Sequence, residues 1–487
     1  MDWLQSLRLI APEETLSIAG LVLLLVAAWG GDKAARLISV ASVAALVGAA
    51  FLVMPALCGG AMGPDAQAFG DQYRADAFAS FAKLLIYGAA AASLVIAPAF
   101  FDRLRAMRAE YPLLILFAAL GMGMMVSASN LLTLYIGLEL NSLASYVLAA
   151  FLRSDDRSAE AGLKYFVLGS LASGILLFGI SLTYGFTGTT SFEGIRVALE
   201  GGLSHGALFG IVFMLAGLAF KISAVPFHMW TPDVYEGAPT PVTTFFATAP
   251  KVAALALTMR VALDAFGPQS DAWRQIVIFA SLASIVVGAL GAIGQANIKR
   301  LMAYSSINNV GFMLIGLAAA TPAGASAMLV YLTIYVAMSL GGFIAILMLK
   351  DEAGEPVEAI AQIAGLSRTR PGLAAALAMV MFSLAGIPPL FGFWGKFVVF
   401  QAAVQAGLVP LAAIGIAASV IGAFYYLKVV KIMYFDEPAD VVKGRSDWAH
   451  QALLVLATVF ISPLGYLLTK WLGGLADVAA SALFLAA

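Results

Sequence analysis

The chain has 487 residues, of which 62% are hydrophobic and only 11% are charged, whereas soluble domains have roughly 45–50% apolar and about 25% charged residues. This composition indicates a protein that lies in a lipid bilayer. The 27 lysine and arginine residues nearly balance 28 aspartate and glutamate residues, so the chain lacks the basic face that nucleic-acid binding requires. The single cysteine, Cys58, excludes an internal disulfide and the roughly four-ligand sites of iron–sulfur clusters and structural zinc.

Apolar runs of about 20 residues, the length that crosses a bilayer as a helix, recur along the whole chain. The acidic residues Asp2, Glu13 and Glu14 stand where a cleaved signal peptide would carry positive charge, so we expect the first run to be a permanent span. The predicted spans are 12–29, 35–55, 77–97, 112–128, 131–151, 161–185, 205–225, 240–263, 273–294, 301–319, 325–349, 372–400, 410–433 and 450–469. They predict an all-α polytopic membrane protein with about fourteen transmembrane helices.

The links between these spans alternate between the two sides of the membrane, which allows a test by the positive-inside rule. One set of links contains seventeen lysine and arginine residues, and the other set, with both termini, contains five. We therefore expect the first set in the cytoplasm and both termini on the outer side. The five remaining cations lie within predicted spans, at Lys83, Lys221, Lys251, Arg260 and Lys396.

Two predicted spans, the seventh and the twelfth, are interrupted by proline. The seventh runs into Pro226, and the twelfth contains Pro388 and Pro389. Proline removes an intrahelical hydrogen bond, and broken backbone at this depth is tolerated only where it is buried in protein or lines a wet cavity. Because the two breaks are five helices apart, equivalent helices would run in opposite directions, as in the inverted-topology repeats of ion transporters. Ordinary kinks are the alternative.

The repeat predicts four segments of the chain. Residues 1–111 hold helices 1–3, and residues 112–263 hold the first five-helix repeat, helices 4–8. Residues 273–433 hold the second, inverted repeat, helices 9–13, and residues 434–487 hold a loop, helix 14 and the C-terminal tail.

Four charged residues stand near the middle of predicted spans: Glu139, Lys221, Lys251 and Lys396. A charge at this depth costs about 2.5–3.5 kcal/mol on insertion scales, so these residues must be paired, hydrated, or both. One acid cannot pair with three bases. Because desolvation lowers the proton affinity of a lysine and a nearby carboxylate raises it, we expect switchable proton sites. The alternative is buried ion pairing that only orders packing.

Other ionisable residues allow more than one interpretation. Lys164 is either an interfacial anchor at the start of helix 6 or part of an internal relay. His228, close to the break in helix 7, is either a proton relay or simply a hydrogen-bonded residue. We expect Lys83 to snorkel to the membrane face and Arg260 to lie at the outer end of helix 8.

Three stretches, residues 221–242, 297–311 and 386–396, resemble the antiporter-like membrane subunits of respiratory complex I, and the resemblance covers essentially all predicted helices. Because residue 396 is lysine, the chain resembles the N-type subunits of the bacterial proton-pumping enzyme more than the M-type subunits, which usually have glutamate at this position. The resemblance implies fourteen helices with inverted five-helix repeats and a proton route through a hydrated central axis. It places Glu139, Lys221, Lys251, Lys396 and Lys164 at the family's functional positions.

The resemblance also implies what the chain does and where it works. It would be a proton-translocating subunit of the NADH:quinone oxidoreductase translocase in the bacterial inner membrane, where the cation count predicts that both termini are periplasmic. NADH oxidation, the flavin, the iron–sulfur clusters and the reduction of a quinone such as ubiquinone would belong to partner subunits, and neighbouring antiporter-like subunits would be among its contacts. One alternative is an Mrp-like cation/proton antiporter subunit without a redox partner. Another is a purely structural membrane scaffold.

Overall fold

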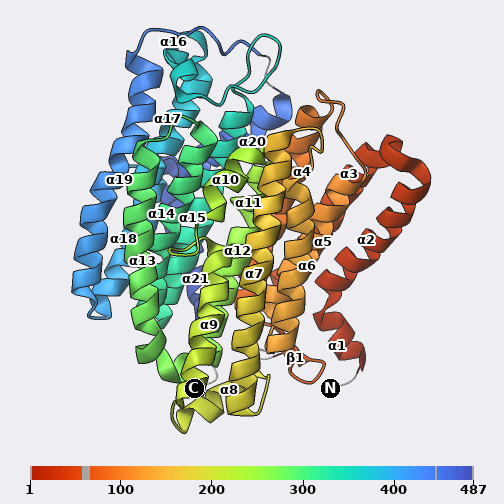
Figure 1. Cartoon of the computed structure of the whole chain (residues 1–487), viewed down its shortest axis with the longest axis vertical. Helices are drawn as coiled ribbons and strands as arrows, with labels where there is room; N and C mark the ends of the chain where they lie inside the picture. The colour runs from red at the N-terminus through yellow and green to blue at the C-terminus, as the bar shows by residue number, and fades with distance from the viewer. Residues whose placement is uncertain (1–2, 58–65, 445–446, 485–487) are drawn as a thin grey trace. The chain divides into compact units, whose positions relative to one another are not determined.

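The computed structural model describes residues 3–57, 66–444 and 447–484, and Cys58 lies outside the described residues. Most of these residues are helical (Figure 1). The helices fall into two compact units. The predicted all-α membrane fold is confirmed.

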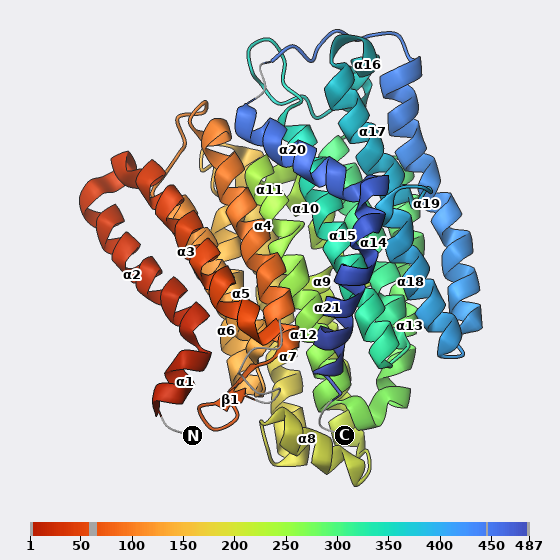
Figure 2. The same cartoon turned by 180° about the vertical axis from the view of Figure 1, so that it is seen from behind.

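Unit 1 contains the chain up to Ile222, together with residues 248–276 and the C-terminal end. Its helix α12 is buried against α4, α5 and α9, and α2 and α3 lie side by side as a hairpin (Figures 1 and 2). Strands β1 and β2 pair antiparallel, with Ala66 opposite Ala75. The elements are α1 Trp3–Leu9, α2 Ala11–Gly30, the 3₁₀ turn Gly31–Ala34, α3 Ala35–Leu57, β1 Ala66–Ala68, β2 Tyr73–Ala75, α4 Ala77–Phe101, α5 Glu110–Ser127, α6 Leu131–Ala149, α7 Asp156–Thr187, α8 Phe192–Glu200, α9 His205–Ile222, α12 Ala249–Arg260, the π-helical turn Val261–Ala265 and the 3₁₀ turn Gly267–Gln269.

Unit 2 contains residues 223–247 and 277–473. Helices α14 and α15 are buried along nearly their whole length, and α10, α11, α18 and α20 pack against one or both of them. The elements are α10 Trp230–Gly237, α11 Thr240–Phe246, α14 Ile298–Ala318, α15 Pro322–Leu347, the 3₁₀ turn Ile360–Ile363, α16 Leu366–Thr369, α17 Pro371–Ala385, α18 Phe391–Gln405, α19 Val409–Phe435, α20 Trp448–Ile461 and the 3₁₀ turn Pro463–Leu468. Two further helices, α13 Ser270–Ile293 and α21 Thr469–Ser481, have residues in both units.

Capping side chains explain where several helices begin. Asp76 accepts a hydrogen bond from the backbone N–H of Ala79 (2.7 Å) at the start of α4. Asn130 accepts one from Leu132 (2.9 Å) at the start of α6. Such acceptors satisfy backbone donors that the first turn of a helix leaves unpaired, so each helix begins directly after its cap.

The predicted count of fourteen transmembrane helices is not confirmed. Among the described residues, eleven helices are long and apolar enough to cross a membrane, or twelve if the bent pair Trp448–Ile461 and Pro463–Ser481 is one span. The run Ala11–Leu57 counts once, although it holds both α2 and α3. The predicted span 372–400 is divided into α17 and α18, of 15 residues each, which are too short to count alone.

Both predicted breaks are present. Helix α9 ends at Ile222 and α17 ends at Ala385, so neither helix continues through the prolines that follow. The next residue has a left-handed backbone in both cases, with φ 63° at Ser223 and 80° at Gly386, and such a residue commonly ends a helix. This shared geometry fits the inverted repeats, while the boundaries of the four predicted segments stay a prediction.

Candidate functional site

Lys221 lies on α9, one residue before the first break, and its ammonium group contacts α6. Its Nζ donates a hydrogen bond to Ser142 Oγ at 2.7 Å and lies 5.7 Å from the centre of the Tyr146 ring. Ser142 in turn donates to the carbonyl of Leu138 at 2.6 Å. Sequence reasoning missed Ser142, because a helix serine carries no signal of its own and only the packing of α9 on α6 side chains reveals its partner.

Glu139 stands three residues before Ser142 and therefore on the same side of α6. Its carboxylate is half-buried, and Oε1 has no hydrogen-bond partner within the described part of the chain. The described residues include no direct ion pair between this carboxylate and the Lys221 ammonium. Ser142, rather than Glu139, is the direct partner of Lys221.

Lys251 lies near the start of α12 and is almost fully buried, with 1% of its surface exposed. Its Nζ donates to the carbonyl of Ile222 at 2.9 Å. Ile222 is the last residue of α9, and the end of a helix carries unpaired carbonyls and a partial negative charge. Both lysines therefore lie at the C-terminal end of α9. Lys221 is its penultimate residue, and Lys251 binds the carbonyl of its last residue.

Lys396 occupies a comparable position in unit 2. Its Nζ donates to the carbonyl of Ala385, the last residue of α17, at 3.1 Å and to Ser419 Oγ of α19 at 3.2 Å, and lies 4.5 Å from the centre of the Phe312 ring. The side chain, 6% exposed, lines a mostly apolar cavity of about 610 Å³ formed by residues of α17, α18 and α19 and the chain after α17. In each unit, a buried lysine thus binds the terminal carbonyl of the half-helix that ends at the break.

The other two candidates lie in different surroundings. Lys164, in α7, pairs with Glu160 one turn earlier at 2.7 Å, and 40% of its side chain is exposed. This placement favours an interfacial anchor over an internal relay. His228 lies in the segment after the first break, where it is half-buried, and its Nδ1 has no hydrogen-bond partner among the described residues. The functional roles of both residues stay predictions.

One expectation about cations is wrong. Lys83 does not snorkel, because it is 2% exposed and forms an ion pair with Glu13 at 2.6 Å. Arg260 is the last residue of α12, where it is fully buried and forms an ion pair with Asp76 at 2.8 Å, and the outward direction of this helix end stays a prediction. In both cases the acidic partner comes from a distant part of the sequence, which a reading of single spans cannot reveal.

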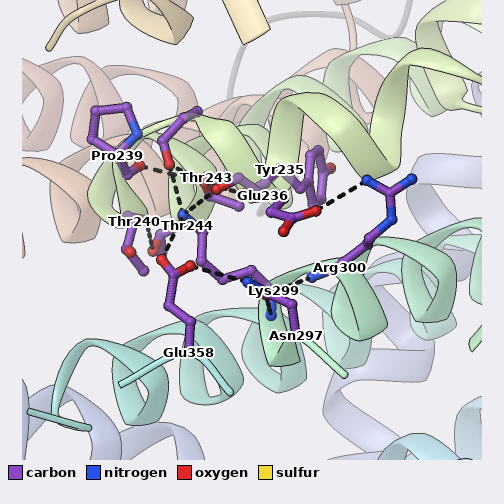
Figure 3. A network of polar contacts seen from close by, with 11 residues as sticks. Tyr235, Glu236, Pro239, Thr240, Thr243, Thr244, Asn297, Lys299, Arg300 and Glu358 are labelled. Atoms are coloured by element: carbon purple, nitrogen blue, oxygen red, sulfur yellow. Dashed lines mark hydrogen bonds and ion pairs between the residues drawn. The ribbon is translucent and has the colours of Figure 1, made fainter. Parts of the chain in front are cut away.

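A polar network in unit 2 holds α10, the helix that follows the first break (Figure 3). Lys299 Nζ donates to the backbone carbonyls of Glu236 and Ala238, both at 2.8 Å, and forms an ion pair with Glu358 at 3.3 Å. Asn297 donates to the other oxygen of Glu358 at 3.0 Å. The start of α14 therefore binds the C-terminal end of α10.

Arg300 adds a second connection between the same two helices. Its Nη1 lies 2.6 Å from Asp233 and 3.0 Å from Glu236, two acidic residues of α10. Lys299 and Arg300 are both among the seventeen lysine and arginine residues of the links expected in the cytoplasm. The structure shows that they also position the segment after the break.

The family described as NADH:quinone oxidoreductase/Mrp antiporter, TM, matches residues 128–422. This is more than half of the chain, and it includes both breaks and all of the lysines discussed above except Lys83. The chain belongs to this family. The predicted resemblance to the antiporter-like subunits is therefore confirmed, and the chain is a multi-pass membrane protein.

One curated relative and two solved structures match nearly the whole chain. The protein called NADH-quinone oxidoreductase subunit N of Erythrobacter litoralis is 71% identical over 486 residues, which is 100% of this chain and 100% of that protein. A chain in the structure of respiratory complex I from Thermus thermophilus with bound aureothin is 32% identical, with a TM-score of 0.80 over 96% of this chain and 99% of that chain. A chain of the Mrp complex from a Dietzia species has a TM-score of 0.83 over 99% of this chain and 98% of its own, but its 22% identity shows a likeness of fold alone.

Proposed function

We propose that the chain is the proton-translocating membrane subunit of a bacterial NADH:quinone oxidoreductase, respiratory complex I. The observation that carries this proposal is the position of three lysines at the two helix breaks, Lys221 and Lys251 in unit 1 and Lys396 in unit 2. The relative that is 71% identical bears the name of subunit N of that enzyme, which supports the same function.

The partners of these lysines suit a group that must both hold and release a proton. Lys221 binds a hydroxyl oxygen, and Lys396 binds a carbonyl and a hydroxyl. Neither forms an ion pair within the described part of the chain. A carboxylate in direct contact would hold the ammonium charged, whereas neutral oxygens in a desolvated site allow it to lose its proton. Lysine can do so where arginine cannot.

Glu139 would adjust proton loading at Lys221 without binding it directly. Its carboxylate favours the charged ammonium through space, so a change in the distance between α6 and α9 would change how readily Lys221 is protonated. Lys164 would anchor α7 at the membrane interface. His228 would relay protons near the first break.

The redox chemistry belongs to partner subunits in this proposal. The chain has a single cysteine and cannot ligate an iron–sulfur cluster, so we assign the clusters, the flavin, NADH oxidation and quinone reduction to other subunits of the complex. Neighbouring antiporter-like subunits and the lipids of the inner membrane would surround the chain. The excess of cations in one set of links supports an arrangement with both termini on the periplasmic side.

Purification of the chain from its own membrane tests this proposal. An affinity-tagged chain should co-purify with subunits that oxidise NADH with an artificial electron acceptor. An Mrp-like antiporter subunit, which the family description and a likeness of fold also allow, would instead purify without this activity and would show cation/proton exchange.

A further inference from the structure

Unit 1 contains a second group of buried charges, separate from the lysines at the breaks. Its six ionisable residues are each at most 6% exposed. They form three ion pairs: Lys83 with Glu13 at 2.6 Å, Arg260 with Asp76 at 2.8 Å, and Arg74 with Asp264 at 2.9 Å. Ionisable groups buried within membrane helices are costly, and they usually mark a functional site.

The pair of Lys83 and Glu13 belongs to a closed ring of short polar contacts. Lys83 Nζ donates a hydrogen bond to the Tyr73 hydroxyl at 2.7 Å, and that hydroxyl donates to Glu13 Oε2 at 2.6 Å. The direct contact of Lys83 with Glu13 Oε1 closes the ring. A proton can therefore pass from the ammonium through the hydroxyl to the carboxylate over short hydrogen bonds.

The two other pairs supply fixed charge, because arginine stays protonated. Asp76 and Arg260 each keep one buried polar atom, Oδ2 and Nη1, without a hydrogen-bond partner among the described residues. These atoms can bind water next to the ring. Arg74 and Asp264 balance each other and contact neither Glu13 nor Lys83 in any ion pair of the described residues.

Helix α12 connects this group with the first break. Lys251 stands near its N-terminal end, and Arg260 is its last residue. A helix of 12 residues spans about 18 Å, so Arg260 lies at least about two helical turns from Lys251, toward the C-terminal end of α12. Glu13 is in the first turn of α2, and Tyr73 is in β2 of the hairpin. Both belong to the side that the cation count places outside the cell.

We propose that Glu13, Tyr73 and Lys83 form a second proton-transfer site, through which protons from Lys251 reach the outer side. The inference rests on the proposed function. The Lys83 ammonium gives a proton to the Tyr73 oxygen while the Tyr73 hydroxyl proton passes to Glu13, which leaves a neutral amine and a carboxylic acid. Lys83 then takes a proton from water on the side of Lys251, and Glu13 releases its proton to outer water. One cycle moves one proton and restores the starting charges.

Lys83→Arg is the main test, because it keeps the positive charge and cannot release a proton. It is measured in the assembled enzyme in native membrane vesicles, as protons pumped per NADH oxidised. We expect at least a tenfold loss of pumping, with normal NADH oxidation by an artificial acceptor. Lys431→Arg is the matched control, because it makes the same change at an exposed lysine that pairs with Asp436 and takes no part in the proposal, and it should pump normally. Normal pumping by Lys83→Arg would overturn the inference.

The double variant Glu13→Gln/Lys83→Met decides the question if Lys83→Arg does not assemble. It removes both charges together, so a purely structural pair predicts recovery of assembly and of pumping, whereas proton transfer predicts assembly without pumping. Lys251→Ala separates this inference from the proposed function. If Lys251→Ala abolishes pumping while the double variant pumps normally, only the second site is wrong. If Lys251→Ala itself pumps normally, the proposed function is wrong.

Discussion

At Lys221, the residue that touches the ammonium is a serine, and the acidic residue acts from a distance. This arrangement differs from an ordinary buried ion pair, in which the partner charge holds the proton in place. Ser142 binds the ammonium on α6, and in the proposed function Glu139, on the same side of the helix, alters the protonation of Lys221. On this proposal, one residue positions the lysine and another controls its charge.

The coupling of Glu139 and Lys221 leads to a first prediction. Glu139→Gln and Lys221→Ala should each reduce pumping several-fold in reconstituted vesicles, with assembly checked by native gel. Glu139→Gln should cost much less when Lys221 is already alanine, because its partner is absent. Fully additive losses would remove the pair from the mechanism. Lys221→Arg should also fail to pump, because a guanidinium does not release its proton.

Gly386 provides a second prediction at the level of one residue. Its φ of 80° costs a residue with a side chain roughly 1–2 kcal/mol, and an added Cβ would lie 2.9 Å from Cδ of Lys396. Gly386→Ala should therefore displace Lys396, lower pumping and reduce stability by about 1–3 kcal/mol. Gly372→Ala is the matched control in α17, because its Cβ would meet nothing within 4 Å. Equal thermal unfolding and pumping of the two variants would contradict this account.

At the scale of elements, each break needs contacts that hold the separated pieces of helix. After the first break, Lys299 and Arg300 at the start of α14 bind the end and the acidic side of α10. At the second break, Lys396 of α18 binds the last carbonyl of α17 directly. Lysine side chains thus bind backbone carbonyls at the helix ends, which a continuous helix would pair with its own N–H groups.

The connection between α14 and α10 gives a third prediction. Lys299→Ala leaves two carbonyls and Glu358 without this partner, and removal of one member of a buried pair costs about 3–5 kcal/mol. Because 17% of the Glu358 side chain is exposed, we expect the lower end of this range in unfolding measurements. Lys431→Ala, which breaks a pair with Asp436 on an exposed part of α19, should change stability by less than about 1 kcal/mol. Equal losses for both variants would contradict the role of Lys299.

The helices and the breaks were predictable from the sequence, whereas the partners of the charges were not. Apolar runs and prolines are local signals, which place both ends of α9 and the start of α17 to within a few residues and predict a break after α17 at Pro388 and Pro389. The contacts of Lys83 and Arg260 join segments that are far apart in the chain. Hydropathy treats each cation alone, so it predicted that Lys83 reaches the membrane face, whereas packing places this lysine against Glu13. The bond from Lys251 to a helix carbonyl has no sequence signal, because any residue supplies that carbonyl.

At the scale of the whole molecule, the distribution of cations predicts how the chain crosses the membrane. In a Cys58→Ser background, an impermeant thiol reagent should label Asp440→Cys only from the cytoplasmic side and Glu200→Cys only from the outer side. Both positions are exposed in the described structure. The reverse labelling, or labelling of both from one side, would contradict the topology and with it the direction of proton release.

We propose that this chain moves protons while its partner subunits carry out the redox chemistry. The most direct measurement compares Lys396→Ala with the unchanged chain in the assembled enzyme, in membrane vesicles supplied with NADH. We predict that Lys396→Ala loses proton pumping coupled to quinone reduction, while NADH oxidation by an artificial acceptor stays at the original rate. Pumping at the original ratio of protons to NADH, in a fully assembled enzyme, would contradict the account.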